Sequence, residues 1–350
     1  MSTVFHLFSL PYVPLKQVFD NFGPTGIFNI SMTSRKSKNI AVSYRGPSKN
    51  VQFDLGFGVK DHVKFFDEEY FGLLVQVLET SELPERTLAT VRIGNFEIIP
   101  VEMGMLYQMP CLKTYWKDRM VGLFEIGKYV REVFNRDIYK VMLGDEYAEN
   151  DHRRAIDWVL ETQKSIEEIY CEFTPRTDED FEYLLEKLAR HAREFSFVVK
   201  PSDGYCPVKI THFMNDDLYL QPSFWIKLDH LLTMNCRSIL LADSTLTYKD
   251  INLFLKHWMS GGCFELKNLD IRVEQSIDYE TTLNGTDYTK RDKELRRDYE
   301  TEMDDTYTIK GGFDIKRSID DVMATVLDDG ANSKLFRMLV WPDFAENSYC

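Results

Sequence analysis

The sequence has few cysteines for its length, and they lie far apart. The 350 residues contain six, none of them close to another: Cys111, Cys171, Cys206, Cys236, Cys263 and Cys350. Disulfide-stapled domains and zinc sites both need closely or regularly spaced cysteines. We therefore expect reduced thiols in a cytoplasmic or nuclear protein, with no metal site.

Long apolar runs are missing as well. No stretch approaches the roughly 18 apolar residues that a membrane-spanning helix needs. The apolar start MSTVFHLFSLPYVP has no basic region before it and is interrupted by Pro11 and Pro14. No small-residue cleavage site follows it. We expect neither a signal peptide nor a membrane partner.

The sequence also lacks catalytic signatures. The patterns GxSxG, HExxH and GxGxxG and the Walker loop do not occur. The seven histidines show no ligand spacing, and the paired aspartates are sequence neighbours, which rarely converge on one reacting atom. A Cys206–His212 pair would have Pro207 between its members and no activating context. We expect a protein that is not an enzyme and binds no cofactor.

Basic residues are in the minority. The formal net charge is −14, which argues against general affinity for nucleic-acid phosphates or anionic lipid. Residues 1–50 differ from the rest, because their only acidic residue is Asp20, against six lysines and arginines. We expect no nucleic-acid partner, and we treat the basic segment as a separate region.

That basic region has a helical pattern. An amphipathic face is formed by residues at i, i+3, i+4 and i+7, namely Leu15, Val18, Phe19 and Phe22. Pro14 is placed to open this helix, and Gly23-Pro24 to end it. A second short helix would present Ile27, Ile30 and Ser31 on one face, and a third, rich in Arg and Lys, would run to about residue 40. Such a small domain buries little surface by itself, so a partner could complete its core.

The rest of the chain predicts a mixture of strands and helices. Short strands are expected at 51–57 and 63–66, and a hairpin at 87–102 that turns at Gly94-Asn95. Helices and strands then alternate: helix 119–135, strand 137–143, a helix around 155–160, strand 166–173, and strands at 238–242 and 266–273. Thr177 with Asp180, and Thr247 with Asp250, have the spacing that caps a helix start.

We expect the α/β (α+β) fold class, with a three-helix N-terminal domain followed by a helix–strand repeat domain. Strand starts recur about every 30 residues in parts, which is typical of leucine-rich-repeat-like architecture. An ordinary α/β domain is the alternative, since no clean LxxLxLxxN series occurs. Residues 278–308 are densely charged, and we expect a solvated insertion or a disordered loop there, with substrate contact or phosphorylation as a functional interpretation.

The stretch FSLPYVPLKQVFDNFGPTGIFNISMTSRKSK resembles an F-box. It departs from the family at Ser37, near a position where the family often carries Trp. The resemblance implies an F-box at 1–48 that docks on a Skp-type adaptor and, through it, on a cullin. The adaptor-binding residues that it implies are Leu10, Pro11, Leu15, Val18, Phe19, Phe22, Pro24, Ile27, Ile30, Ser31 and Lys36.

The segment ILLADSTLTYKDINLFLKHWMSGGCFELKNLDIRV resembles the type-two F-box-associated domain of nematode F-box proteins, over about 195–275. The residues that match its helix are Asn252, Phe254, Leu255, Lys256 and Trp258. FDIKRSIDDVMATV and FRMLVWP, ending at Pro342, resemble the same family's final strands. The resemblance implies that 49–350 bind an unknown protein substrate, in a substrate-recognition subunit of a Skp–cullin–F-box type ubiquitin ligase. The alternative is an interaction scaffold with no ligase link.

Overall fold

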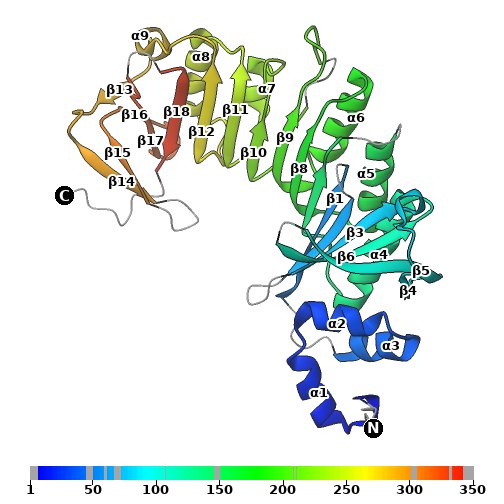
Figure 1. Ribbon diagram of the computed structural model, residues 1–350. Coiled ribbons are helices and arrows are strands. Elements are labelled where there is room, and N and C mark those ends of the chain that lie inside the picture. Colours follow the sequence, from blue (N-terminus) through cyan, green and yellow to red (C-terminus); the bar gives the residue numbers. More distant parts are fainter. Residues whose placement is uncertain are drawn as a thin grey trace. The chain divides into compact units, whose positions relative to one another are not determined.

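The chain is a mixed α/β protein with two compact units, residues 1–168 and 169–350 (Figure 1). The computed structural model describes residues 7–44, 50–58, 61–66, 72–106, 108–145, 150–207, 209, 211–300, 306–330 and 333–341. Residues 1–6 and 45–48 of the predicted F-box, residues 301–305 of the charged segment, Pro342 and Cys350 lie outside them. The predicted mixed α/β class is confirmed.

None of the helices in the described ranges is long and apolar enough to cross a membrane.

Unit 1 begins with a short 3₁₀ turn and three helices: η1 (Leu7–Ser9), α1 (Tyr12–Asp20), α2 (Gly23–Ser31) and α3 (Arg35–Tyr44). The expected start of α1 at Pro14 was wrong, because the helix begins two residues earlier. Pro14 therefore lies in the first turn, where its missing N–H costs no intrahelical hydrogen bond. Gly23 and Pro24 begin α2 and do not simply end α1; Gly23 has a φ of 60°, which favours glycine.

A seven-stranded sheet forms the rest of unit 1, with order β7-β1-β2-β3-β6-β5-β4. The strands are β1 (Gln52–Phe57), β2 (His62–Phe66), β3 (Leu73–Glu79), β4 (Ala89–Ile93), β5 (Phe96–Leu106), β6 (Met109–Trp116) and β7 (Lys140–Leu143), with η3 (Thr80–Glu82) after β3. The predicted β4–β5 hairpin and its turn at Gly94-Asn95 are confirmed. Two helices, α4 (Arg119–Phe134) and α5 (Asp151–Thr162), complete the unit.

The N-terminal helices pack directly on this sheet unit. The Phe28 ring of α2 lies 4.9 Å from the Phe65 ring of β2 and 6.0 Å from the Tyr129 ring of α4. The Tyr129 hydroxyl donates a hydrogen bond of 3.1 Å to the Ser31 hydroxyl. Phe28 and Ser31 are buried, so α2 shares its core with residues beyond position 50.

β8 (Ile166–Phe173) begins at the end of unit 1 and leads into the sheet of unit 2, whose order is β13-β16-β17-β18-β12-β11-β10-β9-β8. Its other strands are β9 (Ala192–Val199), β10 (Asp217–Leu220), β11 (Ser238–Ser244), β12 (Asn268–Val273), β13 (Tyr288–Lys290), β16 (Phe313–Lys316), β17 (Met323–Val326) and β18 (Leu335–Val340). The helices are α6 (Asp178–Leu188), α7 (Leu228–Thr233), α8 (Tyr248–Met259) and α9 (Tyr279–Thr282).

Strands β9 to β12 pair in parallel and follow one another in chain order. Parallel strands need crossover connections, and α7 and α8 supply two of them on one face of the sheet (Figure 1). This succession also occurs in ordinary α/β sheets, so the leucine-rich-repeat-like architecture stays a prediction. The predicted caps are confirmed: the Thr177 hydroxyl accepts from the Asp180 amide at 3.1 Å, and the Thr247 hydroxyl from the Asp250 amide at 3.3 Å.

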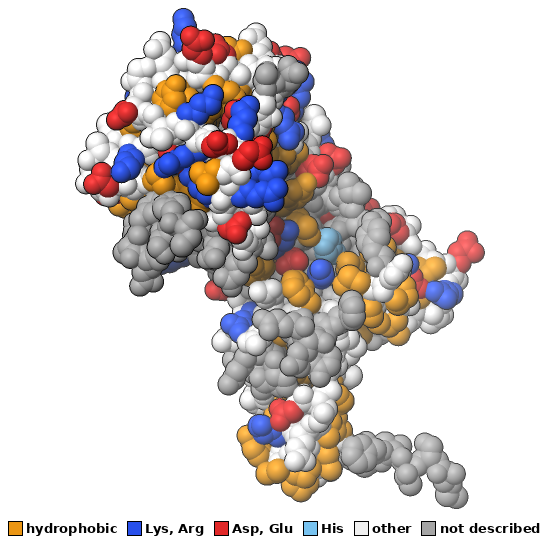
Figure 2. Space-filling view, turned by 90° about the vertical axis from the view of Figure 1, so that its left-hand side faces the viewer, with side chains coloured by type: hydrophobic (Ala, Val, Ile, Leu, Met, Phe, Trp, Pro, Cys, Tyr) orange, Lys and Arg blue, Asp and Glu red, His pale blue; other side chains and the backbone are white. Residues whose placement is uncertain are grey.

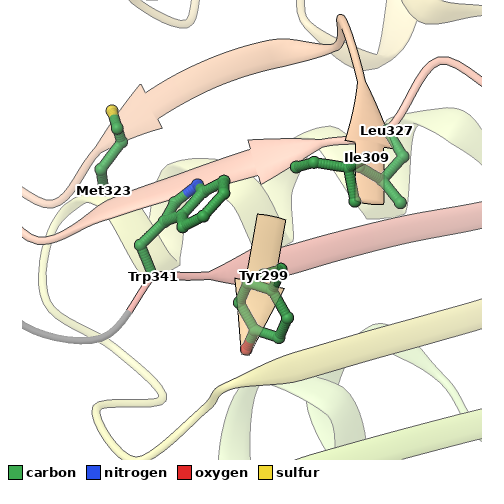
Figure 3. Close-up of a cluster of buried hydrophobic side chains, with 5 residues drawn as sticks. All are labelled: Tyr299, Ile309, Met323, Leu327 and Trp341. Atoms are coloured by element: carbon green, nitrogen blue, oxygen red, sulfur yellow. The ribbon is translucent and has the colours of Figure 1, made fainter. Parts of the chain in front are cut away.

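The charged segment has regular structure over its described part. It contains α9, β13 and the antiparallel pair β14 (Arg296–Glu300) and β15 (Thr306–Lys310). Figure 3 shows how this pair contributes to a cluster of buried hydrophobic side chains, formed by Tyr299, Ile309, Met323, Leu327 and Trp341. The tyrosine hydroxyl of the cluster donates to the Val340 carbonyl at 3.1 Å. The segment is therefore anchored to β17 and the end of β18 despite its charge.

Candidate docking surfaces

The predicted adaptor-binding residues divide into two groups by burial. The first group forms the interior of the N-terminal helices, with Phe19, Ile27 and Ser31 each 1% exposed. Its members are Leu15, Phe19, Pro24, Ile27 and Ser31. Phe19 stacks on Tyr44 of α3 at 5.2 Å. These side chains hold the three helices together and are not available for contact with a partner.

The second group reaches solvent. Pro11, Phe22 and Lys36 are exposed, and Leu10, Val18 and Ile30 are half-buried. Two further side chains beside Pro11 were missed from the sequence: Tyr12 is 69% exposed and Val13 63%. The sequence does show Leu10, Pro11, Tyr12 and Val13 as consecutive apolar residues, but we expected the helix to begin after them, at Pro14.

We call Leu10, Pro11, Tyr12 and Val13 the N-terminal apolar surface. Figure 2 shows hydrophobic side chains gathered at the lower end of the molecule, where α1 lies. The Tyr44 hydroxyl donates to the Tyr12 carbonyl at 3.4 Å, and the two rings lie 5.4 Å apart. The first turn of α1 is thus fixed to α3, which presents its apolar side chains in one defined arrangement.

The described N-terminal helices carry more cations than anions. Residues 7–44 carry Lys16, Arg35, Lys36 and Lys38 against Asp20. Lys16 pairs with Asp20 at 3.0 Å along α1, whereas Lys38 contacts Glu132 of α4 and lies 4.7 Å from the Tyr129 ring. The excess of cations would favour encounter with an acidic partner.

A second candidate surface is the open face of the sheet in unit 2. Residues alternate along the strands, so that Ile239, Leu241, Leu269 and Ile271 are fully buried on the helix side. The strand register places the opposite-facing side chains in rows across the sheet. One such row runs through Tyr219, Leu240, Asp270 and Arg337.

Asp270 dominates the electrostatics of this row. Its burial raises the pKa of the carboxyl to about 6, against a smaller lowering by Arg337. Its Oδ1 atom has no hydrogen-bond partner within the described structure. Arg337 is itself held by Asp329, to which its Nε donates at 2.8 Å. The row therefore offers an aromatic side chain and Leu240, which is 37% exposed, beside a carboxylate whose Oδ1 atom is buried from solvent.

The remaining polar groups give no reactive constellation. Within the described ranges, no group of three or more His, Cys, Asp or Glu side chains could hold a metal ion. Four of the five cysteines described are buried free thiols, and burial raises the pKa of Cys236 to about 12 and of Cys263 to about 11. Such thiols are protonated at neutral pH and behave as core residues. Cys206 is exposed and free.

Comparison with known proteins identifies part of unit 2. Residues 209–271 match a family model described as F-box associated, which spans β10 to β12 and includes α8. A similar curated protein is the Skn-1 dependent zygotic transcript 15 protein of Caenorhabditis elegans, 24% identical over 306 residues, which cover 82% of this chain and 85% of that protein. Another is the E3 ubiquitin-protein ligase hecw-1 of the same organism, 29% identical over 72 residues, or 21% of this chain and 6% of that protein. No solved structure matches.

The family match lies inside the predicted 195–275 region and includes the five helix residues that carried the resemblance, whereas the two later stretches, FDIKRSIDDVMATV and FRMLVWP, lie outside it. Within it, Asn252 is buried and its side-chain amide donates to the carbonyls of Thr282 and Asn284, at 2.8 and 2.9 Å. Phe254, Leu255 and Trp258 are fully buried. These motif residues pack α8 and α9 into the unit, on the side of the sheet opposite to the open face. The F-box at 1–48 stays a prediction.

Proposed function

We propose that the protein is the substrate-recognition subunit of a Skp–cullin–F-box type ubiquitin ligase, acting in the cytoplasm or nucleus. The observation that carries this proposal is the F-box-associated match at 209–271. In this account residues 1–48 dock on the Skp-type adaptor and, through it, on the cullin. Residues 49–350 hold a protein substrate and carry out no chemistry.

The N-terminal apolar surface supports the docking half of the proposal. Tyr12 and Val13 together expose two large apolar side chains on one turn of helix, which a partner would cover with gain of hydrophobic free energy. An aromatic residue at such a position is typical of binding hot spots. We narrow the predicted contact set accordingly to the exposed residues around Leu10-Pro11, because the buried ones already pack within the helices.

The open face of unit 2 supports the substrate half. Its row of Tyr219, Leu240, Asp270 and Arg337 combines apolar, acidic and basic side chains on a rigid scaffold of paired strands. The family-matched segment supplies three of these four residues. We propose that this face contacts the substrate, with the exposed Leu240 among the contacting side chains.

Titration of the purified full chain with a Skp-type adaptor tests the proposal. We expect a one-to-one complex that Tyr12→Asp with Val13→Asp weakens at least about tenfold, because a charged group would be buried at the contact. Leu10→Ala with Pro11→Ala should weaken it as well. Ile98→Asp is the matched control, since Ile98 is 75% exposed in the same unit but belongs to β5. Unchanged affinity in both double variants, or no complex with the unaltered chain, would refute adaptor docking.

A further inference from the structure

A groove runs between the N-terminal helices and the hairpin edge of the unit 1 sheet. Its larger part is a cavity of about 500 Å³ between α2 and strands β4 to β6, lined on its apolar side by Met32, Val91, Met103 and Leu112. A second cavity of about 300 Å³ continues along the start of α3. Met32 and Arg92 line both, so the two hollows form one groove. It lies apart from the N-terminal apolar surface, whose residues line neither hollow.

The floor of the groove is unusually apolar for an exposed position. Met103 is 58% exposed, and Met105, two residues further on the same face of β5, is 65% exposed. β5 continues from Glu102 to Leu106 beyond its pairing with β4, so this end of the strand has no partner on that side among the described residues. Flexible, polarizable methionine side chains adapt to the shape of a bound segment.

The rim of the groove is basic on a chain of net charge −14. The charged residues that line it are Arg35, Lys38, Arg92 and Glu97. Glu97 is the one acidic residue among the lining residues. Its carboxylate forms ion pairs with both Arg92, at 3.1 Å, and Arg35, at 3.8 Å. Arg35 and Glu97 are 75% and 67% exposed, so an incoming carboxylate can replace Glu97 at little desolvation cost.

We propose that this groove is a second protein-docking site, which binds a short segment of a partner with an acidic side chain next to apolar ones. The apolar side chains pack mainly on Met103, since Met32 and Leu112 are only 7% and 4% exposed, and the carboxylate contacts Arg92 and Arg35. The occupant is assigned by charge complementarity: with Lys38 paired to Glu132, Arg35 and Arg92 still outnumber Glu97 by one, and this excess repels basic segments and attracts acidic ones. None of its residues is among Leu10, Pro11, Tyr12 and Val13 or on the open face of unit 2, so the site can be tested separately from the ligase role.

Selection of a random peptide library displayed on phage, with the immobilised full chain as target, tests this assignment. We expect enrichment of peptides that combine Asp or Glu with apolar residues. Synthetic versions should bind about tenfold more weakly to Arg92→Glu and to Met103→Asp, and more weakly as salt is raised. Ile98→Asp, on the opposite face of β5, should bind them as the unaltered chain does. An NMR spectrum of the unaltered chain with labelled methionine methyl groups gives a readout that needs no disruptive change. The Met103 resonance is identified as the one that is missing from the spectrum of Met103→Leu. This resonance should shift when peptide is added to the unaltered chain.

Selected peptides without acidic residues, equal affinity for all variants, or a library without binders would overturn the proposal. The proposal would also be overturned if the unaltered chain sedimented as a dimer while Met103→Asp sedimented as a monomer. In that case a second copy of the chain would cover the groove.

Discussion

At the scale of single residues, the buried carboxylates of the sheets set the pH response. Asp54 of β1 lies in register between Lys64 of β2 and Lys140 of β7 and is 6% exposed. Burial raises the pKa of its carboxyl to about 6, although both lysines lower it. Because the folded-state pKa exceeds the unfolded one, protonation favours folding. This contribution is complete below about pH 4 and is lost as the pH rises through about 6.

We therefore expect Asp54→Asn to flatten the pH dependence of stability. At about pH 7.5 the charged carboxylate costs the folded state on the order of 1–3 kcal/mol, and the neutral amide avoids that cost. Thermal unfolding at about pH 4.5 and about pH 7.5 measures the effect. The melting temperature of the variant, relative to that of the unaltered chain, should be higher at about pH 7.5 than at about pH 4.5. An equal shift of both proteins between the two pH values would contradict the assignment.

Residues whose role is local were predictable, and those whose role depends on tertiary partners were not. Thr177 and Thr247 were identified as caps because the contact they make lies three residues away in the sequence. The helical period also found Leu15 and Phe19, but a period reveals only that a face is apolar. Whether that face is covered by α3, as here, or by another protein depends on residues far along the chain, such as Tyr44.

At the scale of elements, the β14–β15 pair depends on one buried carboxylate. Asp314 of β16 accepts from Arg297 at 2.9 Å and from the Thr325 hydroxyl at 2.7 Å, and it also contacts Arg291. The Arg297 side chain is 5% exposed and lies 5.1 Å from the Trp341 ring. Removing the carboxylate leaves a buried guanidinium without its counter-ion.

Asp314→Ala should therefore destabilise unit 2 by roughly 3–5 kcal/mol. Amide hydrogen exchange, read by peptide, should rise first in β14, β15 and β17. Asp298→Ala is a suitable control, because that carboxylate is exposed and accepts a hydrogen bond of 2.7 Å from the Thr308 hydroxyl in the same hairpin. If the two variants were equally stable, the charged network would be a surface feature with no part in holding the hairpin.

Element prediction succeeded where chemistry along the chain decides the outcome. The β4–β5 turn follows from Gly94-Asn95, and Gly94 does adopt a φ of 57°. The strands within 278–308 were missed because charged residues dominate their composition. Of the segment's described side chains, Tyr299 and Ile309 join the buried cluster, and too few apolar residues alternate to show a period.

At the scale of the whole molecule, the N-terminal helices are part of a larger unit. Phe28 and Ser31 contact β2 and α4, so deletion of residues 1–45 would expose the core of unit 1 as well as remove the proposed hook. Truncation therefore cannot separate adaptor docking from folding. Substitutions at Tyr12 and Val13 leave Phe28 and Ser31 in place, and Val13→Asp alone also leaves the contact between the Tyr12 and Tyr44 rings intact.

We propose that adaptor docking and substrate binding use separate surfaces of one chain. The most direct test compares the proteins that co-purify from cells with the unaltered chain and with the Tyr12→Asp, Val13→Asp variant, by quantitative mass spectrometry. We predict that the Skp-type adaptor and cullin are lost from the variant, whereas other partners are retained and accumulate because they are no longer degraded. Absence of the adaptor and cullin from the unaltered chain, or loss of all partners together, would contradict the account.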